Sequence, residues 1–220
     1  MKFDELNQLF IAYFDTMEIS DEDKQNRVDC AIWLYEAVWF ILTMIRLELD
    51  SDTLEDEDSY SYSLYLRVRD HLEENDLPYE EDYLNRMVKD IVEKTFRHLD
   101  DDDDDDEEEE EEKKAPEKKP EKKENYYLSE KRAIIIAENE ANSIYNYVDY
   151  KRATDEGKEY KIWVTEGDEK VRTSHSLVDW QKIPIDKKFQ VGPDLMRFPH
   201  DYVYGSAENL VNCRCSCLYR

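Results

Sequence analysis

Residue types that bind metal ions gather near the C-terminus of the chain. Cys213 and Cys215 stand two residues apart, and His175 lies upstream of them. Thiolate and imidazole are ligands that zinc prefers in proteins, so these three residues could form a zinc site, with Cys217 or His200 as a further ligand. However, a Cys-x-Cys pair on a strand places both sulfur atoms on one face without a tight metal-binding turn, and the sequence has no second such pair. Two buried thiols therefore remain the alternative to zinc.

Three ionisable residues suggest a second chemistry. Glu140, Arg172 and His175 could act as the general base, anion clamp and acid of a small ribonuclease-like enzyme. Against this, residues 126–220 carry 14 basic and 15 acidic side chains, with no glycine-rich phosphate loop and no nucleophile motif. We therefore expect a structural role, in which Glu140 pairs with Arg172 or Arg214 in a buried network and His175 is a hydrogen-bonded core histidine.

The elements that must position these residues are short and mixed in type. Apolar residues spaced by threes and fours predict a helix at residues 129–147. Alternation predicts a strand at residues 160–165, and shorter strands are expected at 189–191 and 213–218. Residues 126–220 are thus predicted to form a small α+β domain with a short antiparallel sheet.

The informative residues of this region follow one another in a particular order: Arg132, Glu140, Trp163, Asp168, Arg172, His175, Asn212, Cys213, Arg214 and Cys215. This order and spacing resembles the C-terminal domain of the Mu F-like phage head morphogenesis family. That family shows a helix with arginine and glutamate, a Trp…Asp…Arg..His element and a terminal Asn-Cys-Arg-Cys. The resemblance covers about residues 128–219. It departs from the family after the histidine, where Asp179 is followed by Trp180 and not by glycine.

The resemblance implies a minor head protein that associates with portal or capsid protein and has a structural role and no enzymatic one. It places the chain in the virion or the cytoplasm of a bacterial host, in agreement with an N-terminus that lacks the features of a secretory signal. Two alternatives stay open. One is a toxin-type effector nuclease, because such domains travel with this family; the other is an acidic adaptor that binds a basic protein partner.

Residues 1–99 are predicted to form an all-α bundle. The spacing of apolar residues and the helix start signals predict four helices, at residues 3–17, 21–49, 60–74 and 80–98. The apolar run at residues 31–45 contains Glu36 and is shorter than the roughly 20 residues that a bilayer requires, so we expect a buried helix and no membrane contact.

Charge is distributed unevenly along the chain. The net charge is −26, of which residues 1–99 contribute −15 and the aspartate and glutamate tract at 100–112 contributes −13. We predict that residues 100–125 are a disordered acidic linker between two domains. The charge of the N-terminal part disfavours direct binding to nucleic acid, because such binding requires cations. A basic protein surface is the partner that this charge favours.

Overall fold

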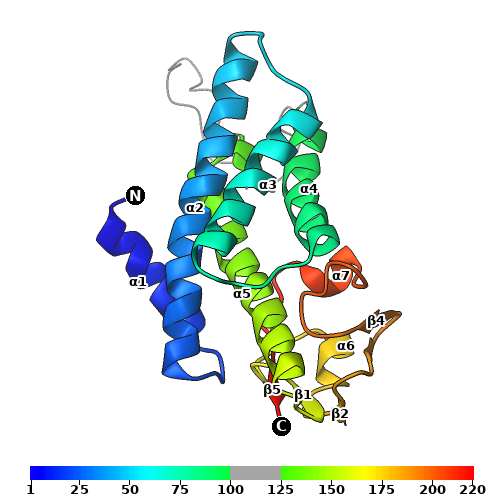
Figure 1. Cartoon of the computed structure of the whole chain (residues 1–220). Helices are drawn as coiled ribbons and strands as arrows, with labels where there is room; N and C mark the ends of the chain where they lie inside the picture. The colour runs from blue at the N-terminus through cyan, green and yellow to red at the C-terminus, as the bar shows by residue number, and fades with distance from the viewer. Residues whose placement is uncertain (100–124) are drawn as a thin grey trace, which may run out of the picture.

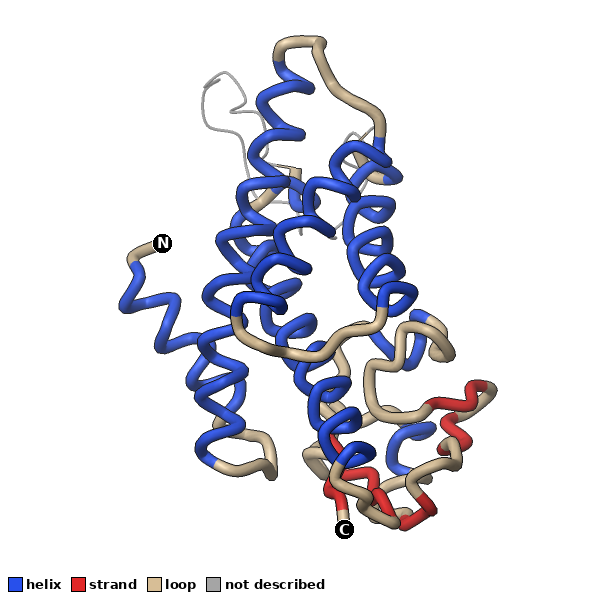
Figure 2. The backbone as a smooth tube through the Cα atoms, in the orientation of Figure 1, coloured by secondary structure: helices blue, strands red, loops and turns tan. Residues whose placement is uncertain are grey.

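Long helices make up most of the molecule, and short strands gather at one end of it (Figures 1 and 2). The computed structural model describes residues 1–99 and 125–220. The predicted linker at 100–125 therefore lies outside the described residues except for Asn125. The fold class is α+β, as predicted, with a helical N-terminal region and small antiparallel sheets in the C-terminal part.

The four predicted N-terminal helices are present within a few residues of the expected bounds. They are α1 (Phe3–Phe14), α2 (Asp21–Asp50), α3 (Glu57–Glu74) and α4 (Glu81–Arg97). The start signal at Ser20 is confirmed, because its Oγ accepts a hydrogen bond of 3.1 Å from the backbone N–H of Asp23. Asp56 caps α3 in the same way, through the N–H of Ser59 at 2.9 Å. Each cap satisfies a backbone donor that the first helical turn leaves without a partner.

The longest helix of the C-terminal part, α5 (Glu130–Asp155), lies alongside α2 (Figure 1). It follows a short 3₁₀ helix (Tyr126–Leu128) and continues beyond the predicted end at residue 147. The sequence suggested that helices within residues 1–99 would surround α2. In the structure α5 also covers it, because apolar side chains occupy more of the circumference of α2 than its N-terminal neighbours bury.

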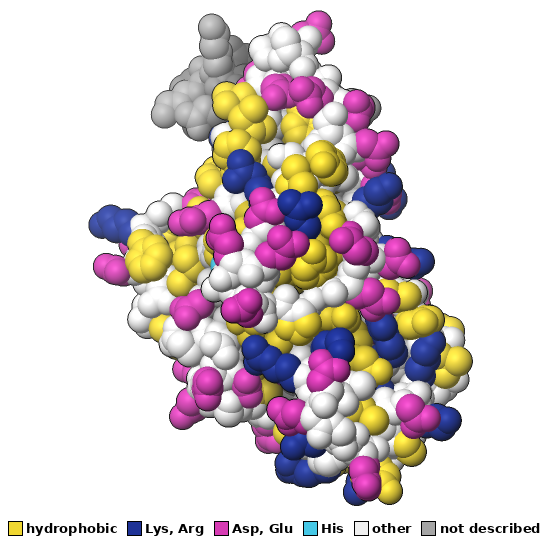
Figure 3. All heavy atoms as spheres, in the orientation of Figure 1, with side chains coloured by type: hydrophobic (Ala, Val, Ile, Leu, Met, Phe, Trp, Pro, Cys, Tyr) yellow, Lys and Arg dark blue, Asp and Glu magenta, His cyan; other side chains and the backbone are white. Residues whose placement is uncertain are grey.

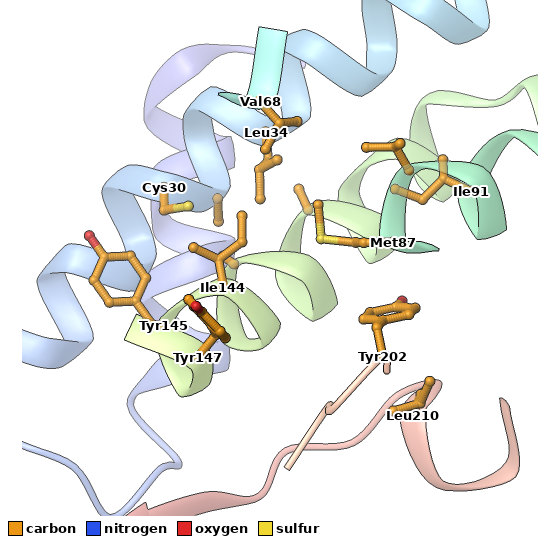
Figure 4. Packing of buried hydrophobic residues seen from close by; sticks show 14 of the residues in the cluster. Cys30, Leu34, Val68, Met87, Ile91, Ile144, Tyr145, Tyr147, Tyr202 and Leu210 are labelled. Carbon is orange, nitrogen blue, oxygen red and sulfur yellow. The ribbon is translucent and has the colours of Figure 1, made fainter. Parts of the chain in front are cut away.

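Side chains from both predicted domains meet in one hydrophobic core. Figure 4 shows Leu34 of α2, Met87 of α4 and Ile144 of α5 converging on the same region, and all three are buried. By length and composition α2 could cross a membrane, but 56% of its most apolar window is buried inside the protein, as in the core helix of a globular domain. The division of the chain into two domains at residues 100–125 stays a prediction.

The strands form two small antiparallel sheets. In the first, the order is β2 (Lys182–Pro184), β1 (Tyr160–Val164) and β5 (Ser216–Tyr219), so β1 lies in the middle. The second is a hairpin of β3 (Phe189–Val191) and β4 (Asp194–Met196). Two single-turn helices, α6 (Thr173–Ser176) and α7 (Ala207–Leu210), lie in the connections.

The predicted strand at residues 213–218 begins later than expected, at Ser216. Cys213 and Cys215 lie in the segment before it, where their backbone carbonyls accept hydrogen bonds from asparagine side chains of α5. These carbonyl oxygens therefore accept from α5 and not from a neighbouring strand. The two cysteines therefore lie outside the strand, and their placement does not follow from strand alternation.

A buried arginine joins α2 to α5. Arg27 has no exposed side-chain area, and its Nη2 lies 2.8 Å from Oδ2 of Asp149 on α5. Its Nε donates to Oδ1 of Asn142, also on α5, at 3.3 Å. Removing one member of a buried ion pair leaves the other charge without compensation, which is far more costly than removing an exposed pair.

We predict that Arg27→Ala lowers the free energy of unfolding by about 3–5 kcal/mol, because Asp149 loses its partner and α2 loses its polar attachment to α5. Urea denaturation followed by circular dichroism measures the change. Arg69→Ala is the matched control, since Arg69 forms a surface pair with Asp70 and should matter little. Equal effects of the two substitutions would show that the buried pair of Arg27 and Asp149 does not stabilise the contact between α2 and α5.

Candidate functional site

The aromatic residue of the motif lies at the centre of the C-terminal part. Trp163 on β1 is completely buried. Its ring meets the His175 ring edge to face at a centroid distance of 5.6 Å, and the Phe189 ring at 5.2 Å. Burial of so large a side chain against two rings fixes where β1, α6 and β3 lie relative to one another.

Three motif residues form a buried group, which we call the His–Cys cluster: His175 of α6 with Cys213 and Cys215. Nδ1 of His175 lies 3.3 Å from Sγ of Cys215 and 3.6 Å from Sγ of Cys213. The ligand atoms of all three residues lie within 4.8 Å of one another. Neither Cys217 nor His200, the further ligands considered from the sequence, belongs to this group in the part of the chain that the structure describes.

Helix α5 holds the segment that carries the two cysteines. Nδ2 of Asn142 lies 3.4 Å from the carbonyl oxygen of Cys213 and 3.3 Å from that of Cys215. Nδ2 of Asn146, one turn further along, donates to the Cys215 carbonyl at 3.1 Å. Nε2 of His200 also bonds the Cys213 carbonyl. These bonds satisfy backbone groups that are buried outside any sheet ladder.

Sequence reasoning missed Asn146 and Asn209 as parts of this site, and it considered His200 only as a further metal ligand. A signal for the first was present: Asn139, Asn142 and Asn146 recur at helical spacing and form a polar stripe on a helix that is otherwise buried. His200 lies in a turn and Asn209 in the single-turn helix α7, where spacing gives no comparable guide.

The charged motif residues bind neighbours other than those predicted. Arg214 forms an ion pair with Asp168, with Nη2 2.6 Å from Oδ2, and this hydrogen bond holds the pKa of Asp168 below its ordinary value. Arg172 donates to the backbone carbonyl of Val211. The predicted pairing of Glu140 with Arg172 or Arg214 is wrong, because Oε1 of Glu140 accepts instead from the hydroxyl of Tyr202 at 2.8 Å.

Arg132 lies at a different place, where α5 meets α4. It is buried on α5, where its guanidinium donates to the Ile91 carbonyl at 3.0 Å and to Oγ1 of Thr95 at 2.5 Å, both on α4. A third bond of 2.7 Å reaches the Tyr127 carbonyl. The hydrogen bonds of this motif residue therefore attach α5 to α4 and do not involve the His–Cys cluster. The last motif residue, Asn212, accepts from Nδ2 of Asn139 at 3.1 Å.

Comparison with known proteins shows the family to which these motif residues belong. The family described as Phage Mu protein F like protein matches residues 106–218. The chain belongs to this family of phage head proteins. The match covers all ten motif residues and confirms the resemblance found in the sequence. No curated protein and no solved structure matches the chain.

The buried thiols of this Mu F-like protein differ in acidity. Burial alone would raise the pKa of Cys213, but the hydrogen bond with Cys215 and the proximity of His200 and His175 lower it well below its ordinary value. The same bond to Cys213, together with burial, raises the pKa of Cys215 well above its ordinary value. The cluster thus favours one thiolate, at Cys213, beside one protonated thiol.

Two hollows lie next to the cluster of the Mu F-like protein. A cavity of about 20 Å³ opens onto His175 and both cysteines, which is enough room for one water molecule. A wider groove of about 490 Å³ lies beside it, between α1, α5 and the motif segments. Arg172 and Arg214 line both hollows. Glu138 lines the groove, and burial raises its pKa to about 7.

Glu140 gives this Mu F-like protein a pH-sensitive core position. Burial raises its pKa from an ordinary 4.5 to about 7, although His200 and the hydrogen bond from Tyr202 oppose the rise. Its Oε2 has no hydrogen-bond partner within the described residues. The folded state binds the Glu140 proton more tightly than the unfolded state does. The protonated carboxyl therefore contributes its full stabilisation of the fold below pH 4.5, and this contribution is lost as the pH rises through 7.

We predict that Glu140→Gln removes this part of the pH dependence. Between pH 4.5 and 8 the wild type should lose roughly 2–4 kcal/mol of stability relative to the variant, from a pKa difference of about 2.5. Denaturant unfolding at several pH values measures this, and Glu208→Gln, at an exposed site, controls for the loss of a charge. Parallel stability curves for the wild type and Glu140→Gln would show that Glu140 is not the titrating group.

Proposed function

We propose that this chain is a minor head protein that acts in phage head morphogenesis by binding portal or capsid protein, and that it catalyses no reaction. The observation that carries the proposal is that the motif residues of the family are buried or bonded to other parts of the protein. Trp163 and His175 are buried, Asp168 is paired with Arg214, and Arg172 bonds a backbone carbonyl. Residues engaged in this way fix the shape of a surface, which is what an assembly component requires.

The nuclease alternative is weaker on the same geometry. It needs Glu140 as a base and His175 as an acid on opposite sides of one substrate. Both are buried, and their side chains bond Tyr202 and Asn209 respectively. The cavity beside His175 has room for only one water molecule, and the wider groove is not lined by Glu140. A polynucleotide would therefore not reach both groups at once.

The charge of the helical part supports a second contact within the head. Residues 1–99 carry a net charge of −15, and Figure 3 shows acidic side chains spread over the helices. Basic side chains are more frequent toward the end that contains the strands (Figure 3). We propose that the acidic helices face a basic surface of another head component, while the C-terminal part docks on portal or capsid protein. Complementary charge of this kind speeds association and selects partners.

Sedimentation of heads tests the proposal. A phage from which the gene is deleted is complemented with the wild-type chain or with Glu140→Gln, and heads are purified and probed for the protein. We expect both chains to co-sediment with heads and to restore infectious particles equally, because Glu140 has no catalytic task. The proposal fails if the wild type never associates with heads. It also fails if the glutamine variant folds normally and is present in heads, yet restores no infectivity.

A further inference from the structure

The donor atoms of the His–Cys cluster are spaced as in a metal site. In tetrahedral zinc with Zn–S near 2.3 Å and Zn–N near 2.0–2.1 Å, neighbouring sulfur and nitrogen ligands stand about 3.6 Å apart. Nδ1 of His175 lies 3.3 Å from the Cys215 sulfur and 3.6 Å from the Cys213 sulfur. An ion could therefore take its place among the three atoms with small side-chain adjustments.

A hydrogen-bond chain directs the correct ring nitrogen of His175 toward the sulfurs. Nδ2 of Asn209 donates to Oδ2 of Asp194 at 2.7 Å and to the Val191 carbonyl at 3.1 Å, which fixes the orientation of its amide. Its Oδ1 therefore faces Nε2 of His175, at 3.2 Å, and accepts a hydrogen bond from the N–H group at that position. With the proton on Nε2, the lone pair of Nδ1 points at the cysteines. Metal-binding histidines are generally held by such an outer acceptor.

The surroundings leave one coordination position open. The cavity of about 20 Å³ touches all three ligand residues and accommodates one water molecule. The indole N–H of Trp163 is buried and makes no regular hydrogen bond within the described residues. It lies near Cys215, where an N–H group would stabilise a metal-bound thiolate. Three protein ligands with one solvent position are the arrangement of an open zinc site.

We propose that His175 Nδ1, Cys213 Sγ and Cys215 Sγ bind one Zn²⁺ ion, with water as the fourth ligand. Binding forms two Zn–S bonds and one Zn–N bond and releases to solvent the protons of whichever thiols are still protonated. The inference is independent of the head-assembly role. Its consequence lies in the fold: the ion fixes the segment before β5 to α6, a connection that is otherwise made by weak thiol–imidazole hydrogen bonds.

Metal analysis of the purified full chain tests the site. After saturation with zinc and removal of excess, we expect about one ion per chain in the wild type and in Cys217→Ser, and loss of the ion in Cys213→Ser and Cys215→Ser. Cys217 is the matched control because it is also buried and lies two residues further along, outside the cluster. Substoichiometric zinc in the wild type, or retention by both cluster variants, would overturn the proposal.

Two further measurements guard against a variant that merely unfolds. Cobalt added to the wild type should give the intense bands of tetrahedral Co²⁺ together with thiolate-to-metal charge transfer, and their absence would count against the site. Asn209→Ala leaves all three ligands in place but removes the outer acceptor. It should weaken zinc binding roughly 10–100-fold in a chelator competition while circular dichroism stays unchanged. Unchanged affinity in a folded Asn209→Ala chain would refute the proposed coordination through Nδ1.

Discussion

A buried amide side chain joins α2, α5 and the C-terminal segment of this protein. Asn142 of α5 has no exposed area; its Oδ1 accepts from Arg27 of α2, and its Nδ2 faces the carbonyls of Cys213 and Cys215. Each of these groups is buried, and a buried polar group without a partner costs about 1–3 kcal/mol. Rotation of this one side chain would disturb all of them together. This one residue therefore links α2 directly to the C-terminal segment, in addition to the core that the two parts share.

The C-terminal arrangement follows from this constraint. Because the Cys213 and Cys215 carbonyls bond α5, the segment turns away from the sheet before β5 begins and its sulfurs meet His175. β5 then pairs with β1, and Trp163 of β1 packs edge to face against the His175 ring. Helix α5 thus contacts both parts of the chain. Its asparagine side chains bond the segment of Cys213 and Cys215, and its Ile144 packs against the N-terminal helices (Figure 4). The family's motif helix is also a core helix of the acidic N-terminal part.

Local signals in the sequence were sufficient for the helices and for the family. Apolar spacing and the cap at Ser20 predicted α2 within a residue, and the ordered motif ending at Cys215 predicted the membership that the comparison shows. Contacts between segments that are distant in the sequence were harder to predict. The bond between Glu140 and Tyr202 depends on a loop whose path no periodicity reveals. The cover that α5 gives to α2 was missed because residues 100–125 suggested a separation of the two parts.

Amide hydrogen exchange of the full chain tests the central role of Asn142 most directly. In Asn142→Ala, we expect backbone protection to fall together in α2 around Arg27 and in β5, because both depend on the same amide. Asn146→Ala, which removes a bond to Cys215 alone, should affect β5 and leave α2 protected. If Asn142→Ala leaves α2 as protected as in the wild type, the two parts of the chain are not coupled through this residue and the account is wrong.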